Sequence, residues 1–354
     1  MAETDADMLA MLEDAAGAFA RGVPRAAGEG RDCWREIGAL GWLAILVGED
    51  QGGLGLGFAH VACIPRTLGR FAVATPFAGG SMAVVLAAAG SDQALLADSI
   101  AGMRRVAAIL PPLDGADDAF EYSEGRLTGE AGFVSPSDAD SFVIALANPA
   151  RLLRFDREAK GVSVAMRPCP DGTELAWLTL DAVPASLIGE ADAVAAATRR
   201  AWQTGLLAVS AELLGAMDGA LDLTLAYLRT REQFGAPIGT LQVLQHRAVD
   251  MWIQRQMSAA AVAGAVAVLD DPASDAGAAM RRVLGAKVRA SEAARFVVTS
   301  ALQLHGAIGF TEEYALAEYF NRVMALAARF GSAGELRRNY ARTSPLLAAL
   351  DAAA

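Results

Sequence analysis

Apolar residues recur at helical spacing near both ends of the chain. Met8, Leu9 and Leu12 repeat in this way, and a similar set begins at Trp34, which predicts helices over about residues 5–99. From about residue 193 the same period returns in long stretches, at 197–229, 241–269, 276–305 and 313–328. Four long antiparallel helices are the natural packing of such stretches.

Between these helical regions, about residues 104–187 show short apolar runs instead. The runs occupy 105–110, 142–146, 162–166 and 175–180, and turn residues such as Pro111-Pro112 and Asp171-Gly172 separate them. Short strands at this spacing predict a small β-barrel or sandwich. The predicted fold class is α+β but mainly α, with an N-terminal helical domain (1–103), a middle β-barrel (104–191) and a C-terminal four-helix bundle (192–354).

Charge and composition narrow the classes of partner. The formal net charge is −11, and an acidic chain gains little from counterion release, so we expect no nucleic-acid partner. Three cysteines without a CxxC pair predict neither a disulfide framework nor a metal site, and they suit a reducing cytoplasm. The acidic start argues against a signal peptide. The longest apolar run, residues 257–269, is too short for membrane insertion and is predicted to be a buried helix.

Glycines cluster at residues 48–57, which read GEDQGGLGLG. Their spacing is not that of the dinucleotide-binding G-x-G-x-x-G motif, and no strand-helix-strand unit surrounds them. We therefore expect a tight turn between helices at this point.

The segment 229–239, RTREQFGAPIG, combines a cation, an aromatic ring and helix-breaking residues. Arg231 is suited to neutralise and hydrogen-bond a pyrophosphate, and Phe234 offers a face on which an adenine can stack. Gly235 and Pro237 end the helix, so that this corner projects. The alternative is a solvated Arg–Glu pair beside a core phenylalanine.

This segment, with Gln242 and a helix after it, resembles the R-x-Q-F-G-x-x-I signature of the acyl-CoA dehydrogenase family. A second segment, 303–314 (QLHGAIGFTEEY), resembles the Q-x-x-G-G-x-G-F-T segment of the same family, and weaker matches follow in order at 40–55 and 180–190. The resemblance covers nearly the whole chain. It implies the fold of that family, an FAD cofactor and the α,β-dehydrogenation of an acyl-CoA substrate.

In family members, the Arg-Phe corner of one subunit and the Q-x-x-G-G segment of its neighbour meet FAD. The resemblance therefore assigns FAD contacts to both motifs, at Arg231, Phe234, Gly235, Gln242, Gln303 and Gly306. Ala307 stands where the family usually has a second glycine. His305 is interpreted as a packed or interface histidine.

In the β region, Phe133 and Ser135 replace the family's W-I-T/S beside the flavin ring. We predict that Phe133 packs on an edge of the ring and that Ser135 donates a hydrogen bond to it, with plain barrel packing as the alternative. The family's T-E-P-x-A-G-S-D loop, which borders flavin and thioester, is replaced by residues 110–115.

The sequence lacks the expected catalytic base. The chemistry of the family needs a carboxylate within hydrogen-bond reach of the substrate α-carbon. The usual position of this glutamate falls on Gly331, and the alternative position on an earlier helix falls near Gly205. Glu212, about two helical turns after Gly205, and Glu335, one turn after Gly331, are the remaining candidates.

A shortened β domain and an absent base resemble the small subunits of two-component acyl-CoA dehydrogenases. The resemblance implies a degenerate chain that shares FAD sites with a catalytic sister chain in a heterotetramer and passes electrons to an electron-transferring flavoprotein. Two alternatives stay open. One is a self-sufficient homo-oligomeric dehydrogenase with an unusual base, and the other is a non-catalytic scaffold without flavin.

Overall fold

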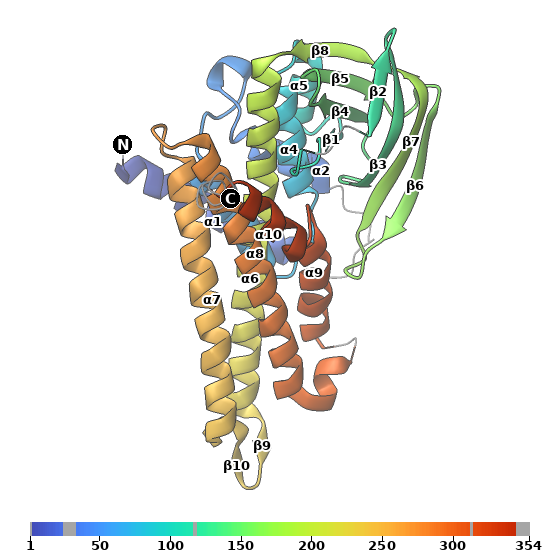
Figure 1. Cartoon of the computed structure of the whole chain (residues 1–354). Helices are drawn as coiled ribbons and strands as arrows, with labels where there is room; N and C mark the ends of the chain where they lie inside the picture. The colour runs from blue at the N-terminus through green and yellow to red at the C-terminus, as the bar shows by residue number, and fades with distance from the viewer. Residues whose placement is uncertain (1, 24–32, 116–118, 312–313, 345–354) are drawn as a thin grey trace, which may run out of the picture. The chain divides into compact units, whose positions relative to one another are not determined.

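A computed structural model describes residues 2–23, 33–115, 119–311 and 314–344 (Figure 1). The chain divides into two compact units. Unit 1 comprises Met1–Glu29, Ala62–Ala74 and Leu206–Ala354, and unit 2 comprises Gly30–Val61 and Thr75–Gly205. Two helices, α3 (Phe58–Arg70) and α6 (Asp192–Thr230), contribute residues to both units.

Unit 1 consists mainly of long helices, as the apolar period predicts. Besides its parts of α3 and α6, it contains α1 (Ala2–Gly22), α7 (Gln242–Leu269), α8 (Ala276–His305), α9 (Leu316–Ala328) and α10 (Ala333–Arg342). Helix α8 packs against α7, α9 and α10. Side chains define the helix ends: Asp275 accepts a hydrogen bond from the Ala278 N–H at the start of α8, and Ser332 and Glu335 form a capping box at the start of α10.

The unit 1 parts of α3 and α6 pack with their backbones in close approach. A side-chain carbon at Gly69 would collide with the carbonyl oxygen of Glu212, and one at Gly215 would collide with that of Arg66. The Arg66 guanidinium also lies 3.4 Å from the carboxylate of Asp218. Glycine is therefore required at this crossing because there is no space for a methyl group.

Unit 2 contains two four-stranded sheets, with strand orders β1-β4-β5-β8 and β2-β3-β7-β6. The strands are β1 (Val106–Ile109), β2 (Phe120–Ser123), β3 (Arg126–Val134), β4 (Ser141–Leu146), β5 (Arg151–Asp156), β6 (Val162–Pro168), β7 (Glu174–Pro184) and β8 (Ser186–Glu190). Only the β1–β4 pair is parallel among the described strand pairs of these two sheets.

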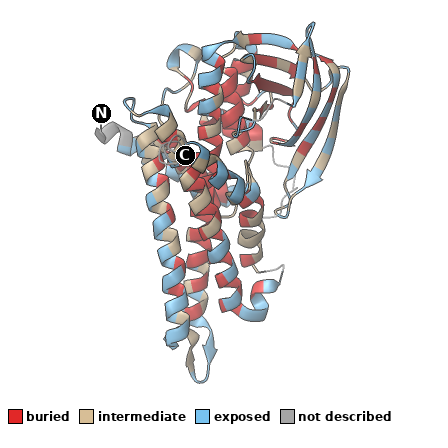
Figure 2. Ribbon diagram, viewed as in Figure 1, coloured by how far each residue is buried: buried red, intermediate tan, exposed pale blue. Residues whose placement is uncertain are grey.

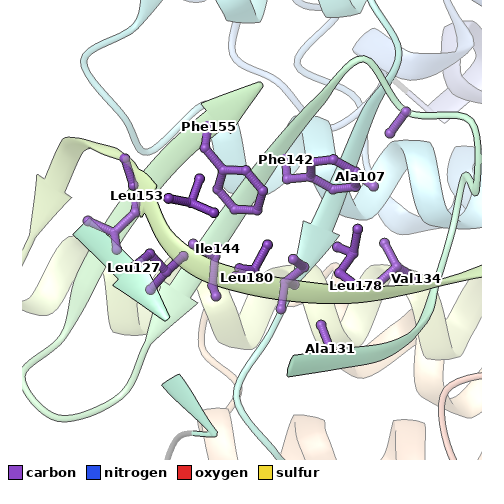
Figure 3. Packing of buried hydrophobic residues seen from close by; sticks show 14 of the residues in the cluster. Ala107, Leu127, Ala131, Val134, Phe142, Ile144, Leu153, Phe155, Leu178 and Leu180 are labelled. Carbon is purple, nitrogen blue, oxygen red and sulfur yellow. The ribbon is translucent and has the colours of Figure 1, made fainter. Parts of the chain in front are cut away.

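The two sheets enclose one apolar core (Figure 3). Phe142 on β4 stacks on Phe155 of β5 with ring centroids 5.1 Å apart, while Leu127 on β3 and Leu178 on β7 enter from the other sheet. Strand β7 alternates buried and exposed positions along most of its length, whereas every residue of β4 is buried (Figure 2). Helix α4 (Phe77–Ala87) packs on β1 and β4, so β4 is covered on both faces.

The remaining helices of unit 2 are short: α2 (Cys33–Ala39), α5 (Gln93–Ile100) and the 3₁₀ segments η1 (Trp42–Ala44) and η2 (Glu49–Gln51). The glycine cluster at 48–57 forms a tight turn, as predicted. Gly52 has φ of 81°, and a side-chain carbon at Gly53 would collide with the carbonyl oxygen of Val47. The three cysteines are free.

One element prediction is wrong in part. Residues 257–269 were expected to form a buried helix, but they are the second half of α7, where Met257 is 52% exposed. Within this run only Ser258, Val262 and Ala265 are buried. The run is apolar on all sides, yet α7 packs along one side only, so apolar content alone could not define the buried face.

Candidate functional site

The predicted corner of cation and aromatic ring follows α6, in a hairpin of β9 (Glu232–Gln233) and β10 (Ala236–Pro237). Phe234 and Gly235 form its two-residue turn with φ of 55° and 81°, as in a type I′ turn. Phe234 is 94% exposed, so it is not a core residue. A left-handed conformation at a non-glycine residue costs on the order of 1–3 kcal/mol, and such strain concentrates at ligand-binding sites.

Arg231 lies at the base of this hairpin and is exposed. Its carbonyl oxygen accepts a 2.8 Å hydrogen bond from the Ile238 N–H, which closes the hairpin. Its guanidinium has no ion pair or hydrogen bond with any residue that the structure describes, Glu232 included. Gln242, the first residue of α7, is likewise exposed. The corner therefore presents an unneutralised cation beside an exposed ring.

The second motif forms the end of α8 and the 3₁₀ segment η4 (Gly306–Phe310). Gly306 has φ of 62° and ψ of −142°, a conformation that glycine adopts without strain. Gln303 and Gly306 are both exposed. The Tyr227 hydroxyl donates to the carbonyl oxygen of His305 at 3.3 Å, and Tyr227 precedes Arg231 by one helical turn. The two motifs therefore lie at the same end of the unit 1 helices (Figure 1).

His305 is buried between two tyrosines at this end. Its ring stacks on Tyr227 with centroids 4.4 Å apart and lies 5.2 Å from the ring of Tyr314. Nδ1 lies 2.8 Å from the Ala301 carbonyl oxygen, so Nδ1 carries the proton and Nε2 is an acceptor without a partner among the described residues. Burial lowers the pKa of His305, although the hydrogen bond to Ala301 acts in the opposite direction. This packed, neutral state agrees with the interpretation from the sequence.

Phe133 and Ser135 lie at the end of β3 in unit 2. Phe133 is 69% exposed, has φ of 59° and contacts the ring of Trp177 edge-on, with centroids 5.7 Å apart. A side-chain carbon at Gly132 would lie within 3 Å of that ring, so glycine lets Trp177 pack directly on the strand. Trp177 was not identified from the sequence. The alternation in the run 175–180 nevertheless places it on the exposed face of β7, the face away from the buried Leu178. Ser135 is half-buried.

The two expected positions of the base lie in separate units. Gly331 follows α9 with φ of 111°, and a side-chain carbon there would lie 3.0 Å from Cδ2 of Leu336. Gly205 lies within α6, where a side-chain carbon would collide with Sδ of Met82. Neither position accepts a larger residue without local rearrangement.

The two candidate carboxylates both have partners. Glu212 is 4% exposed, and its Oε1 accepts a hydrogen bond from Nε of Arg322 at 2.7 Å. Glu335 closes the capping box: its Oε2 accepts from the Ser332 N–H at 2.8 Å and from the Ser332 hydroxyl at 2.7 Å. Arg322, the partner of Glu212, was not identified from the sequence, because the two residues lie 110 positions apart.

Among the residues that the structure describes, no group of three or more His, Cys, Asp or Glu side chains could hold a metal ion. Among the helices described, none combines the length and apolar content needed to cross a membrane.

The chain resembles known proteins in both sequence and structure. The family model for the acyl-CoA dehydrogenase N-terminal domain matches residues 9–95, and that for the C-terminal domain matches residues 196–344. The acyl-CoA dehydrogenase IpdE2 of Mycobacterium tuberculosis is 30% identical over 84% of this chain and 82% of its own length. FadE28 of the same organism is 27% identical over 84% and 88%.

Solved structures give the same result. The Tcur3481-Tcur3483 steroid ACAD is 28% identical, with a TM-score of 0.83 over 100% of this chain and 99% of that one. The FAD complex of PigA, at 19% identity and a TM-score of 0.83, shares the fold. The chain belongs to the acyl-CoA dehydrogenase family, the FAD-dependent oxidoreductases that act on the CH–CH group of acyl-CoA thioesters.

Proposed function

We propose that this chain is a subunit that holds FAD and takes part in oxidising an acyl-CoA thioester, while a sister chain supplies the catalytic base. Gly331 is the observation that carries the proposal. By the family resemblance, its position corresponds to that of the family's glutamate, and its φ of 111° and the nearby Leu336 disfavour any side chain there. Because Glu212 and Glu335 have other partners, neither is available as a base without breaking its own hydrogen bonds.

The residues of unit 1 fit the phosphates and adenine of FAD. Arg231 offers a charged donor that has no ion pair with a carboxylate among the described residues, and charge-assisted hydrogen bonds to phosphate are among the stronger ones. Phe234 provides an exposed ring for stacking. At Gly306 the absent side chain leaves the backbone open to close approach, and Gln303 and Gln242 add exposed amides.

The residues of unit 2 fit an aromatic ring system. Phe133 and Trp177 form an exposed pair on a sheet surface whose neighbouring outward residues, Glu130 and Thr179, are polar. Ser135, two residues after Phe133, supplies a hydroxyl. FAD, when bound, supplies the acceptor for the hydride that leaves the substrate β-carbon. The protein groups would orient its ring and exclude water from it.

An apolar face on α7 supports the need for a second chain. Val249, Trp252, Ile253 and Met257 are all between 41% and 53% exposed, and their spacing places them on one side of the helix. We name these four residues the α7 stripe. Such a row of exposed apolar residues is typical of a protein–protein interface. The related Tcur3481-Tcur3483 ACAD is named after two proteins, which is in line with a two-chain assembly.

The experiment is a titration of flavin binding in the chain alone and in a mixture with a catalytic sister chain. Colourless protein that becomes yellow only with the sister chain supports the shared site. Yellow protein that turns over substrate alone would favour the self-sufficient homo-oligomer. A complex that assembles but never retains flavin would favour the scaffold. In the proposed assembly, we expect reduced flavin to pass its electrons to an electron-transferring flavoprotein.

A further inference from the structure

A buried lysine holds the end of α9. Lys287, on α8, is fully buried. Its Nζ lies 2.9 Å from the Ser291 hydroxyl and 3.2 Å from each of the carbonyl oxygens of Leu326 and Ala327. These carbonyls belong to the last turn of α9, where helix carbonyls lack the usual partner one turn further along the helix. The carbonyl oxygen of Leu326 also accepts a hydrogen bond from the Arg329 N–H at 3.1 Å. Lys287 therefore ties α8 to the C-terminal end of α9.

The segment that follows this turn is short and conformationally demanding. Phe330 and Gly331 both have positive φ, 59° and 111°, and the capping box of Ser332 and Glu335 begins α10 directly afterwards. The Gly331 N–H reaches back to the Ala328 carbonyl oxygen at 3.3 Å. Residues 329–331 thus lie between two anchors, the Lys287 contact with the end of α9 and the capping box at the start of α10.

The hydrogen-bond partners of Lys287 suit a neutral amine. A neutral amine has two N–H donors and one lone pair. The two carbonyl oxygens accept from the donors, and the Ser291 hydroxyl can turn to donate to the lone pair. An ammonium can also use all three groups as acceptors, but it has no carboxylate among its hydrogen-bond partners. Hydrogen bonding therefore permits either state, and charge decides between them.

The surrounding charges disfavour the ammonium. Burial lowers the pKa of Lys287 to about 7, and the positive charge of Arg329 adds to the effect. Glu292, on α8 itself, pairs with Arg337 of α10, and Glu335 of α10 accepts from Ser332. Other charged groups on the neighbouring helices are Glu212 of α6, paired with Arg322, and Asp218 of α6, paired with Arg255 of α7. Asp250 of α7 is exposed, and Glu318 lies in the first turn of α9.

The basic residue at this buried position is a lysine, although most basic residues of the chain are arginines. Of the 30 lysine and arginine residues in the chain, only Lys160 and Lys287 are lysines. Arginine stays charged under all ordinary conditions, whereas a buried lysine can lose its proton. The fully buried position is thus occupied by the basic residue that can become neutral.

We propose that Lys287 is a proton-operated latch: the neutral amine holds the end of α9 and residues 329–331 in place, and uptake of a proton loosens them. In the closed state the end of α9 and residues 329–331 are held by Lys287, and in the open state they are loosened and Lys287 is exposed to water. The open state therefore binds the proton more tightly than the closed state. The closed state is then favoured as the pH rises from about 7 towards the ordinary pKa of lysine, about 10.4. The inference concerns unit 1 alone and does not depend on flavin binding.

The direct test is NMR of protein labelled with ¹³C at the lysine ε-carbon. Two signals are expected, and the exposed Lys160 serves as the reference. The Lys287 signal should shift near pH 7 in the wild-type protein. It should move to higher pH in Ser291→Asp, because a carboxylate next to Nζ retains the proton. A Lys287 signal that shows no titration below about pH 10 in the wild-type protein would overturn the proposal.

Hydrogen exchange tests the mechanical consequence. After correction for intrinsic rates, protection of the amides of residues 329–336 should rise with pH above 7, by up to about tenfold per pH unit, the limit for one linked proton. Amides in the middle of α7 should show no such trend. In Lys287→Met the trend should vanish. A flat wild-type profile at 329–336, with a titrating Lys287, would show that the proton does not control the segment and would refute the latch.

Discussion

Arg322 on α9 donates a hydrogen bond from Nε to Oε1 of Glu212 on α6, at 2.7 Å, and both side chains are at least 95% buried. Glu212 was one of two candidates for the missing base. A base must exchange protons with the substrate, whereas this carboxylate is already hydrogen-bonded to a buried guanidinium. We therefore interpret the pair as a structural link between α6 and α9.

The first prediction is that Glu212 supports stability rather than catalysis. Glu212→Ala leaves the Arg322 charge buried without a partner and should lower the free energy of unfolding by about 3–5 kcal/mol. Urea denaturation of the purified chain measures this. The double variant Glu212→Leu/Arg322→Met removes both charges and should recover much of the loss.

The same residue separates the two interpretations of the site. Glu212→Gln keeps the shape of the side chain but removes its charge. In a complex with a catalytic sister chain, we expect turnover to persist wherever the variant remains folded. Normal stability with turnover reduced by about 10²-fold or more would instead identify Glu212 as a base.

The second prediction concerns Arg231 and flavin. In the assembled complex, Arg231→Ala should weaken flavin binding by about 10- to 150-fold, which corresponds to roughly 1.5–3 kcal/mol for a lost charge-assisted hydrogen bond. Circular dichroism should stay unchanged, because the guanidinium has no partner among the described residues. Arg229→Ala, an exposed arginine in the last turn of α6, is the matched control. Equal flavin affinity in both variants would favour a solvated surface arginine.

The periodicity of apolar residues predicted the long helices well, because α6 to α9 each bury a face over many turns. It missed short elements whose composition conceals them. Strand β5 reads RLLRFD and carries charge at both ends, while α10 reads AGELRRNYAR and buries only Leu336. The capping box at Ser332 and Glu335 was a readable signal for α10.

The candidate site was partly predictable for a similar reason. Arg231 and Phe234 are adjacent in a local motif, so their exposed corner follows from the chain itself. The contact of Phe133 with Trp177 and the pair of Glu212 with Arg322 join residues far apart in sequence. Such pairs depend on tertiary packing, which a single sequence does not specify.

The third prediction tests the α7 stripe as an interface. Met257→Glu introduces a buried charge if a second chain covers α7, and it should reduce assembly as measured by light scattering at micromolar concentration. Met103→Glu in unit 2 is the control, since Met103 is also an exposed methionine, at 68%. Loss of assembly in the control alone would place the interface elsewhere.

The fourth prediction is a pH dependence set by His305. Because burial lowers the pKa of His305 in the folded state, the unfolded chain binds this proton first as the pH falls. The contribution to stability is present above about pH 6.5 and is lost below it, with a limiting slope of about 1.4 kcal/mol per pH unit. His305→Phe should flatten that part of the profile in urea unfolding. Identical slopes for both proteins would mean that His305 does not titrate differently on unfolding.

The central claim is that this chain lacks its own base, and turnover by the single chain tests it most directly. The purified chain, saturated with FAD, is assayed with straight-chain, dicarboxylic and sterol-derived acyl-CoA esters and an electron acceptor, with and without a catalytic sister chain. Without a positioned carboxylate at Gly331, proton abstraction loses an acceleration of typically about 10²–10⁴-fold. We predict negligible turnover by the chain alone and turnover with the sister chain present. Robust dehydrogenation of any of these esters by the single chain would contradict the account.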